Sequence, residues 1–332
     1  MTRLVFRGLL FFLGGWLLIY SLAWLAEKTS PDSTATFLLI DEMHVNNVLA
    51  NRSDVEALVL GSSHGDDIDF PTLNYRGFTL ARAWGDLFET EYYLKFLVPK
   101  LPSLKAVFIP VSYFTFSWDN ASVEKLNVRR SQMYTVIPTW GFIPGDIKNF
   151  LVGRGNKLFP IQGVLREDNW SSVVYAMIHR ESNSGVYQEL VENCDYKSEI
   201  ELDKISSGRV DDTVRSMQEI AARRPGIQDD TYRKAQDIIR FLQQRGIRVV
   251  FFTPPYYSKY TDYFMQNDTD SIAVMEANME RLKDTFGVEY YDHSRDRAFV
   301  NDYRNFKDSD HLNLCGKQSF SGVLEQEMSL AK

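Results

Sequence analysis

The chain of 332 residues has little cysteine, little histidine and no excess of basic residues. Its two cysteines, Cys194 and Cys315, lie far apart and form no CxxC pair, so neither a disulfide framework nor a zinc knuckle is indicated. A single bridge is compatible with the sequence, but two free thiols are the expected state. The formal charge of −7 leaves no basic stripe to neutralise phosphates, which argues against a nucleic-acid partner.

The N-terminus lacks charge over 19 consecutive residues, from Gly8 to Ala26. At about 1.5 Å per residue, a helix of this length nearly spans a ~30 Å hydrocarbon core. Arg3 and Arg7 precede the run and no comparable basic excess follows it, so we expect a cytoplasmic N-terminus. A cleaved signal peptide is the alternative, because the run ends in small residues, although signal h-regions are usually only about 7–15 residues long. Either way, the chain after about Glu27 is expected outside the cytoplasm.

These features divide the chain into a membrane anchor (1–27), a tether (28–52) and an extracytoplasmic domain (53–332). Residues from about 118 to 224 are rich in Asn, Ser, Trp and Tyr and show weak periodicity. We interpret them as an insertion or lid over the sheet edge that carries no recognisable chemistry.

In the rest of the domain, short apolar runs alternate with amphipathic segments. Continuous apolar runs that end in Gly, Pro or small polar residues are typical of buried parallel strands. A helix is expected from Asp230, as its N-cap, to Gly246, and a second helix should end at Gly287. This alternation predicts an α/β domain with a parallel sheet flanked by helices. The expected strands cover 55–60, 78–86, 106–114, 247–253 and 288–292.

Two serines follow the first expected strand. The stretch "LGSSHG" places Ser62 and Ser63 at the carboxyl end of this strand, where open α/β sheets bind ligands. A serine hydroxyl needs a base to lose its proton, and histidine is the usual one.

The stretch "FKDSDHLNLCG" follows the last expected strand and supplies such a base, His311. Asp308, three residues earlier, can fold back and orient the imidazole. Asp310 is the direct neighbour of His311, and adjacent side chains diverge, so we expect it to be peripheral. A Gly-Ser-Ser turn or an Asp-x-x-His is usually structural when it occurs singly, but the two flank the sheet in one chain here.

This arrangement resembles the SGNH/GDSL superfamily of esterases and acyltransferases, from about residue 55 to residue 330. The resemblance implies a flavodoxin-like three-layer fold with Ser63 as nucleophile, His311 as base and Asp308 as its orienting acid. It also implies that the backbone N–H groups of Ser63 and Gly85 hold the oxyanion. No cofactor and no metal are implied.

The chain departs from the family where a Gly-x-Asn-Asp pattern usually supplies an oxyanion donor. The corresponding strand end is "IPVSYF". Ser112 is its nearest hydroxyl donor, while Asn120 lies far along the chain. The loss of one oxyanion donor can cost about 10²–10³ in turnover.

The anchor and the "GSSH" turn are more loosely similar to a subset of the superfamily, the membrane-anchored proteins of bacterial envelope acyl transfer. D-alanyl-lipoteichoic-acid transfer proteins and alginate O-acetylation proteins belong to this subset. The similarity implies an O-acyltransferase, with O-acetyl the expected group, that takes an acyl donor and a polysaccharide acceptor and works with a multipass membrane acyltransferase. A carbohydrate esterase with the same triad and a non-catalytic scaffold for such an acyltransferase are the alternatives.

Further side chains have open roles. His64, next to Ser63, is a candidate for substrate contact, although neighbouring side chains at a strand end point apart. A metal site from His64, His293 and His311 is conceivable, but no HExxH-type pair supports it. Aromatic residues could stack on sugar rings or belong to the core and its rim. The aromatic candidates are Trp140, Trp170, Tyr256 and Tyr257.

Overall fold

A computed structural model describes residues 44–123, 130, 133–134, 136–137 and 193–330. Residues 44–126 and 191–332 group into one unit, which carries the sheet. The predicted anchor and most of the predicted tether lie outside the described residues, as does residue range 138–192. In the part that is described, no helix is long and apolar enough to cross a membrane.

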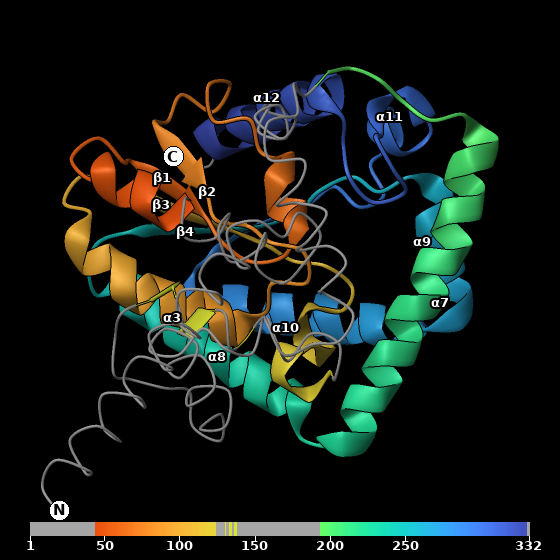
Figure 1. Ribbon diagram of the computed structural model, residues 1–332, viewed down its shortest axis with the longest axis horizontal. Helices are drawn as coiled ribbons and strands as arrows, with labels where there is room; N and C mark the ends of the chain where they lie inside the picture. The colour runs from red at the N-terminus through yellow and green to blue at the C-terminus, as the bar shows by residue number, and fades with distance from the viewer. Residues whose placement is uncertain (1–43, 124–129, 131–132, 135, 138–192, 331–332) are drawn as a thin grey trace, which may run out of the picture. The chain divides into compact units, whose positions relative to one another are not determined.

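The unit contains a five-stranded sheet in which all neighbouring strands are parallel (Figure 1). The strand order is β2-β1-β3-β4-β5, which is the order of flavodoxin-like folds. The predicted α/β domain with a parallel sheet is therefore confirmed. The strands are β1 (Ala57–Val59), β2 (Gly77–Thr79), β3 (Ala106–Pro110), β4 (Arg248–Thr253) and β5 (Glu289–Asp292).

Helices cover both faces of this sheet. The longer ones are α3 (Leu87–Leu97), α7 (Glu199–Arg223), α8 (Ile227–Gln243), α9 (Ser258–Asn267), α10 (Thr269–Phe286) and α12 (Leu314–Leu330). Short helical segments are η1 (Ser63–Asp67), η2 (Val98–Lys100), η3 (Thr115–Ser117), η4 (Asn120–Ser122), α11 (Arg297–Val300) and η7 (Tyr303–Asn305).

Alternate residues of the central strands point to opposite faces, and both sets are buried. On one face, Val59, Phe108 and Phe252 share a core cluster with Phe320 and Leu324 of α12. Figure 1 shows α12 on this side of the sheet and α3, α8 and α10 on the other. Burial on both faces explains why the central strands are continuous apolar runs without alternation.

Three expected helix boundaries can be compared with the structure. The predicted end at Gly246 is wrong, because α8 ends at Gln243 with Gln244 as its C-cap, and Gly246 follows in the left-handed conformation (φ 69°). The predicted start at Asp230 is wrong, because α8 has Gly226 as its N-cap. Asp230 lies in the first turn, where its carboxylate binds Arg224 and Arg233 instead of a backbone N–H. The predicted end of α10 is confirmed, since Gly287 is its C-cap in the left-handed conformation (φ 63°).

A disulfide joins Cys194 to Cys315, with 5.2 Å between their Cα atoms. The expectation of two free thiols is therefore wrong. The bridge ties the segment before α7 to the first turn of α12, and Leu314 N–H donates to the Asn193 carbonyl beside it (3.1 Å). Because 121 residues separate the two cysteines, no local pattern could indicate their pairing.

This disulfide should stabilise the domain measurably, because it closes a long loop in the unfolded chain. We expect reduction to lower the free energy of unfolding by about 2–4 kcal/mol. Urea unfolding of the full-length protein, followed by circular dichroism with and without dithiothreitol, measures the change. The control is Cys194→Ser combined with Cys315→Ser, which should match the reduced protein and ignore the reductant. Coincident unfolding curves for the oxidised and reduced wild type would contradict the expectation.

Candidate active site

Two strand ends meet at the point where the strand order reverses. From β1 the chain moves to one side to form β2 and then returns to form β3 on the other side. Such a reversal opens a crevice at the carboxyl ends of the strands. Ser62 and Ser63 follow β1 there, and Ser112 follows β3. The Ser62 and Ser112 hydroxyls lie 3.3 Å apart.

The residues predicted as nucleophile, base and orienting acid lie in one hydrogen-bonded row. Ser63 Oγ is 2.8 Å from His311 Nε2, and His311 Nδ1 is 2.8 Å from Asp308 Oδ1. Asp308 Oδ1 also accepts from the backbone N–H groups of His311 (3.0 Å) and Asp310 (3.2 Å). The carboxylate is thus fixed by its own loop, as Asp side chains in turns commonly are.

The loop that carries His311 is fastened to the turn that carries Ser63. The backbone N–H of Leu312 donates to Asp67 Oδ1 in η1 (2.9 Å), and both residues are fully buried. Leu312 also forms a β-bridge with Phe306 across the loop. These contacts bring together two segments at opposite ends of the domain sequence.

Arg209 of α7 reaches the same site. Its Nη1 donates to Asp310 Oδ1, lies 3.2 Å from Asp308 Oδ1 and lies 3.3 Å from His311 Nδ1. Sequence reasoning missed Arg209, because it falls in the range expected to be an insertion without chemistry. The regular signal there was the capping box of Ser198 and Glu201, which starts α7.

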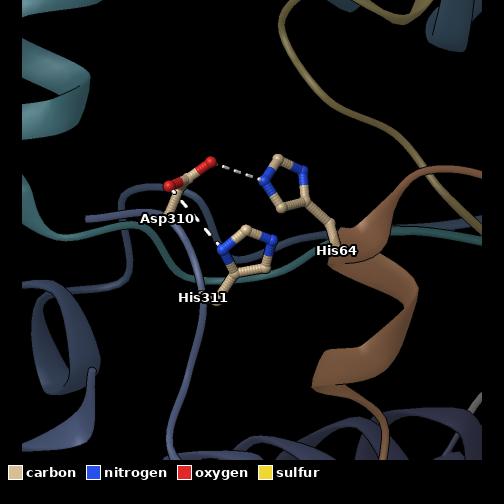
Figure 2. Close-up of side chains that lie close together, drawn as sticks. All are labelled: His64, Asp310 and His311. Carbon is tan, nitrogen blue, oxygen red and sulfur yellow. Dashed lines mark hydrogen bonds and ion pairs between the residues drawn. The ribbon is translucent and has the colours of Figure 1, made fainter. Parts of the chain in front are cut away.

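His64 is buried (1% exposed) beside the triad. Figure 2 shows its ring near that of His311, with Asp310 hydrogen-bonded to His64 and 3.7 Å from His311 Nδ1. His64 Nε2 lies 3.1 Å from Asp310 Oδ2, and Nδ1 lies 2.5 Å from Ser112 Oγ. Burial lowers the pKa of His64, so its ring is neutral near pH 7. The Nε2–H of the ring therefore donates a hydrogen bond to the Asp310 carboxylate, and Nδ1 accepts a hydrogen bond from the Ser112 hydroxyl.

The triad histidine has the opposite shift. Burial lowers the pKa of His311, but the charges of Asp310 and Asp308 outweigh burial and raise the pKa to about 9. Burial likewise raises the pKa of each carboxyl, yet the cations His311 and Arg209 hold both below the ordinary value. Near pH 7 the site thus contains two carboxylates, an imidazolium and a guanidinium. The His311 imidazole becomes neutral only as the pH rises toward 9.

The three predicted oxyanion donors, Ser63, Gly85 and Ser112, differ in whether they already have a hydrogen-bond partner. The Gly85 N–H donates a hydrogen bond to the Arg82 carbonyl (2.9 Å), and the Ser112 hydroxyl donates one to His64 Nδ1. Neither is directed at an oxyanion in this arrangement, because both already serve a neighbour. Within the described residues, the Ser63 N–H has no hydrogen-bond partner and stays a candidate donor. Asn120, discounted for its distance along the chain, folds back so that its N–H reaches Asp86 Oδ2 (2.8 Å).

A pocket of about 160 Å³ opens beside the triad. Trp84 forms part of its wall with a positive φ of 62°, a conformation that is strained for a bulky residue. The indole stacks on Trp118, with ring centroids 4.7 Å apart. By contrast Tyr256 and Tyr257 are 0% and 2% exposed, so of the two alternatives for these aromatic residues the structure supports the core and not sugar stacking. Trp140 and Trp170 lie outside the described residues. The pocket is lined by Ser63, His311, Arg209, Trp84, Phe114 and Tyr260, among others.

His64, Asp310 and His311 also have the composition of a metal-ligand set, with their ligand atoms within 4.8 Å of one another. The Arg209 guanidinium contacts Asp310 and lies 3.3 Å from His311 Nδ1, so a cation already occupies this position. His311 Nδ1 is moreover bonded to Asp308. His293, the third member of the conceivable metal site, instead binds Glu327 (3.0 Å) and Asp296 (3.4 Å). The group therefore fits a hydrogen-bond network better than a metal centre.

No protein-family model matches the chain, and no curated protein matches it significantly.

Gly85 offers a test of how the crevice is built. A Cβ at this position would lie 2.0 Å from the Gly61 carbonyl oxygen, at the end of β1. We expect Gly85→Ala to displace the Ser62–Ser63 turn and to destabilise the domain by about 1–3 kcal/mol, as overpacking does. The matched control is Gly208→Ala on α7, where a Cβ meets nothing within 4 Å and the change should be neutral or stabilising. Urea unfolding of the two variants measures the difference, and equal stabilities would refute this packing constraint.

Proposed function

We propose that this protein is an extracytoplasmic serine O-acyltransferase that places an acyl group, most simply acetyl, on a hydroxyl of a cell-envelope or exported polysaccharide. The observation that carries the proposal is the row from Ser63 Oγ through His311 to Asp308, with both links at 2.8 Å. An acyl donor and a glycan acceptor are its substrates in this proposal.

The chemistry follows from the row. Neutral His311 takes the Ser63 proton as Oγ attacks the donor carbonyl, and the resulting imidazolium protonates the leaving group. An acyl ester on Ser63 remains. His311 then removes the proton of a sugar hydroxyl, whose oxygen attacks this ester, and returns the proton to Ser63 Oγ as it leaves. Asp308 keeps the Nδ1 proton in place and stabilises the imidazolium in both halves.

The pocket limits the acyl group. A cavity of about 150 Å³ holds a ligand the size of benzene, so about 160 Å³ accommodates a short acyl group and part of the acceptor, not a fatty acyl chain. Trp84, Phe114 and Tyr260 offer apolar and aromatic walls to the methyl group and to a sugar ring.

The fold supports the finer assignment to the SGNH/GDSL type. The serine follows the first strand, and the Asp-x-x-His follows the last strand and precedes the final helix, as in that superfamily. The oxyanion site differs from that of the superfamily, because Gly85 N–H and the Ser112 hydroxyl are hydrogen-bonded to other residues. This is the observation that favours a non-catalytic scaffold as a second candidate.

The compartment is part of the proposal. The Cys194–Cys315 disulfide favours an oxidising environment, and the uncharged run from Gly8 to Ala26 favours a membrane anchor. Both support a globular domain outside the cytoplasm, held near a multipass membrane acyltransferase that would supply the acyl group.

The test is acylation of a single serine. We expect a fluorophosphonate probe to label Ser63 in the full-length protein, and mass spectrometry of the labelled peptide to locate the adduct. Ser63→Ala should abolish labelling and lower turnover of p-nitrophenyl acetate by about 10⁴–10⁶. Ser62→Ala is the matched control and should be labelled normally. An adduct on Ser62, or none in the wild type, would count against the proposed nucleophile.

Esterase and transferase activities differ in what attacks the acyl-enzyme. We expect the wild type to transfer acetyl from p-nitrophenyl acetate to an added envelope oligosaccharide. Mass spectrometry of the glycan should then show a gain of about 42 Da, the mass that one acetyl group adds. Release of acetate without any glycan product would favour the esterase.

A further inference from the structure

The carboxylate of Asp310 is the centre of a second set of contacts that the triad itself does not need. The side chain is 7% exposed. One oxygen, Oδ2, accepts from His64 Nε2 (3.1 Å), while Oδ1 accepts from Arg209 and from the Ser309 hydroxyl (3.0 Å). Oδ1 also lies 3.7 Å from His311 Nδ1. As expected, Asp310 forms no hydrogen bond with His311 Nδ1, but its carboxylate is not peripheral, because it lies within the site.

Asp310 holds two side chains that touch the triad. The His64 ring packs against the His311 ring, with centroids 5.0 Å apart, so the orientation of one limits that of the other. Arg209 bridges Asp310 to Asp308, the orienting acid. Without the Asp310 carboxylate, buried His64 would lose the acceptor of its Nε2 proton, and Arg209 would keep only one anionic partner.

Asp310 also contributes charge next to the base. Groups from three elements face His311: Asp308 and Asp310 on its own loop, His64, Asp66 and Asp67 in η1, and Arg209 on α7. The charges of Lys307 and Lys317 oppose the effect of burial on Asp66 and Asp67 and act to lower the pKa of both carboxyls. Burial raises the pKa of Asp67 to about 7, so this carboxyl is only partly charged near neutral pH. The two loop carboxylates are then the main charges that favour a proton on His311, and Arg209 opposes them.

We propose that Asp310 is a positioning residue, which orients His64 and Arg209 around the triad and, through its charge, sets the pH range in which His311 can accept the Ser63 proton. The proposal rests on the proposed acyl-transfer chemistry of Ser63. It assigns a role to the second aspartate of "DSDH" that differs from the role of Asp308, which bonds His311 directly.

The direction of the effect follows from charge. His311 acts as a base only when neutral, so the rate of Ser63 acylation rises with pH through the pKa of His311. Loss of the Asp310 charge destabilises the imidazolium, and the midpoint of this rise moves to lower pH. Loss of the Arg209 charge stabilises the imidazolium, and the midpoint moves to higher pH. A single charge within about 4–6 Å typically shifts a pKa by 1–3 units. Because Asp310 and Arg209 partly neutralise each other, we expect the shift in the His311 pKa to lie at the lower end of this range.

The experiment measures the burst rate of p-nitrophenol release from p-nitrophenyl acetate as a function of pH. It compares the full-length wild type with Asp310→Asn and Arg209→Gln. We expect midpoints about 1 unit below and about 1 unit above that of the wild type, respectively. Asp310→Glu, which keeps the charge, should restore a midpoint near the wild-type value. The matched control is Asp302→Asn, which removes another arginine-paired carboxylate and should leave the midpoint unchanged. Superimposable midpoints for wild type and Asp310→Asn would overturn the proposal.

A second measurement separates this inference from the proposed function. NMR titration of protein labelled with ¹³C-histidine reports the His311 pKa without any turnover, and His311→Gln assigns the signal. If no variant is acylated yet the His311 pKa falls in Asp310→Asn, the acyl-transfer function fails and the charge effect of Asp310 stands. If Ser63 is acylated and the His311 pKa is the same in both proteins, the role of Asp310 fails. If circular dichroism shows that Asp310→Asn does not fold, Arg209→Gln provides the test. An unshifted midpoint in the pH profile of Arg209→Gln would then reject the proposal.

Discussion

The site depends on one buried hydrogen bond, from the Leu312 N–H to the carboxylate of Asp67 (2.9 Å). The two residues lie 245 positions apart in the chain, yet each is next to a different part of the triad. Asp67 ends the helical turn that Ser63 begins, and Leu312 follows His311 directly. A buried N–H without an acceptor costs about 1–3 kcal/mol, so the pairing gives the loop one strongly favoured position. In that position the His311 ring reaches Ser63.

Close backbone packing completes the same edge of the sheet. Gly85 lies against the Gly61 carbonyl, at a distance that only glycine tolerates, and this contact sets where β1 ends and the serine turn begins. The disulfide fastens the start of α12, four residues beyond His311, to the segment that leads into α7. Arg209 therefore reaches the site on a helix whose preceding segment is disulfide-bonded to the first turn of α12, just after the loop that Arg209 contacts. The charge balance among Asp308, Asp310, Arg209 and His311 is a consequence of this arrangement.

The features of the fold and site that have local sequence signals could be predicted. Continuous apolar runs located the strands, and the order of elements predicted a parallel sheet. Ser63, His311 and Asp308 could be selected because a strand end or a three-residue spacing gives each a defined position. The rest depends on distant contacts. Arg209 and the cysteine pair carry no local pattern, since their partners lie about 100 residues away or more. The contacts of Asp310 with His64 and Arg209 could not be predicted, because the bend of its loop, which turns it back toward His64, is fixed by tertiary contacts.

The central claim is that Ser63, His311 and Asp308 act as one unit, and a double-variant comparison tests it most directly. Turnover of p-nitrophenyl acetate would be measured for Ser63→Ala, for Asp308→Asn and for the two combined, each checked for folding by circular dichroism. Members of one catalytic unit are strongly non-additive, so the combined variant should be no slower than Ser63→Ala. A further loss in the combined variant, equal to the loss from Asp308→Asn in the wild-type background, would show that the two residues act independently and would contradict the account.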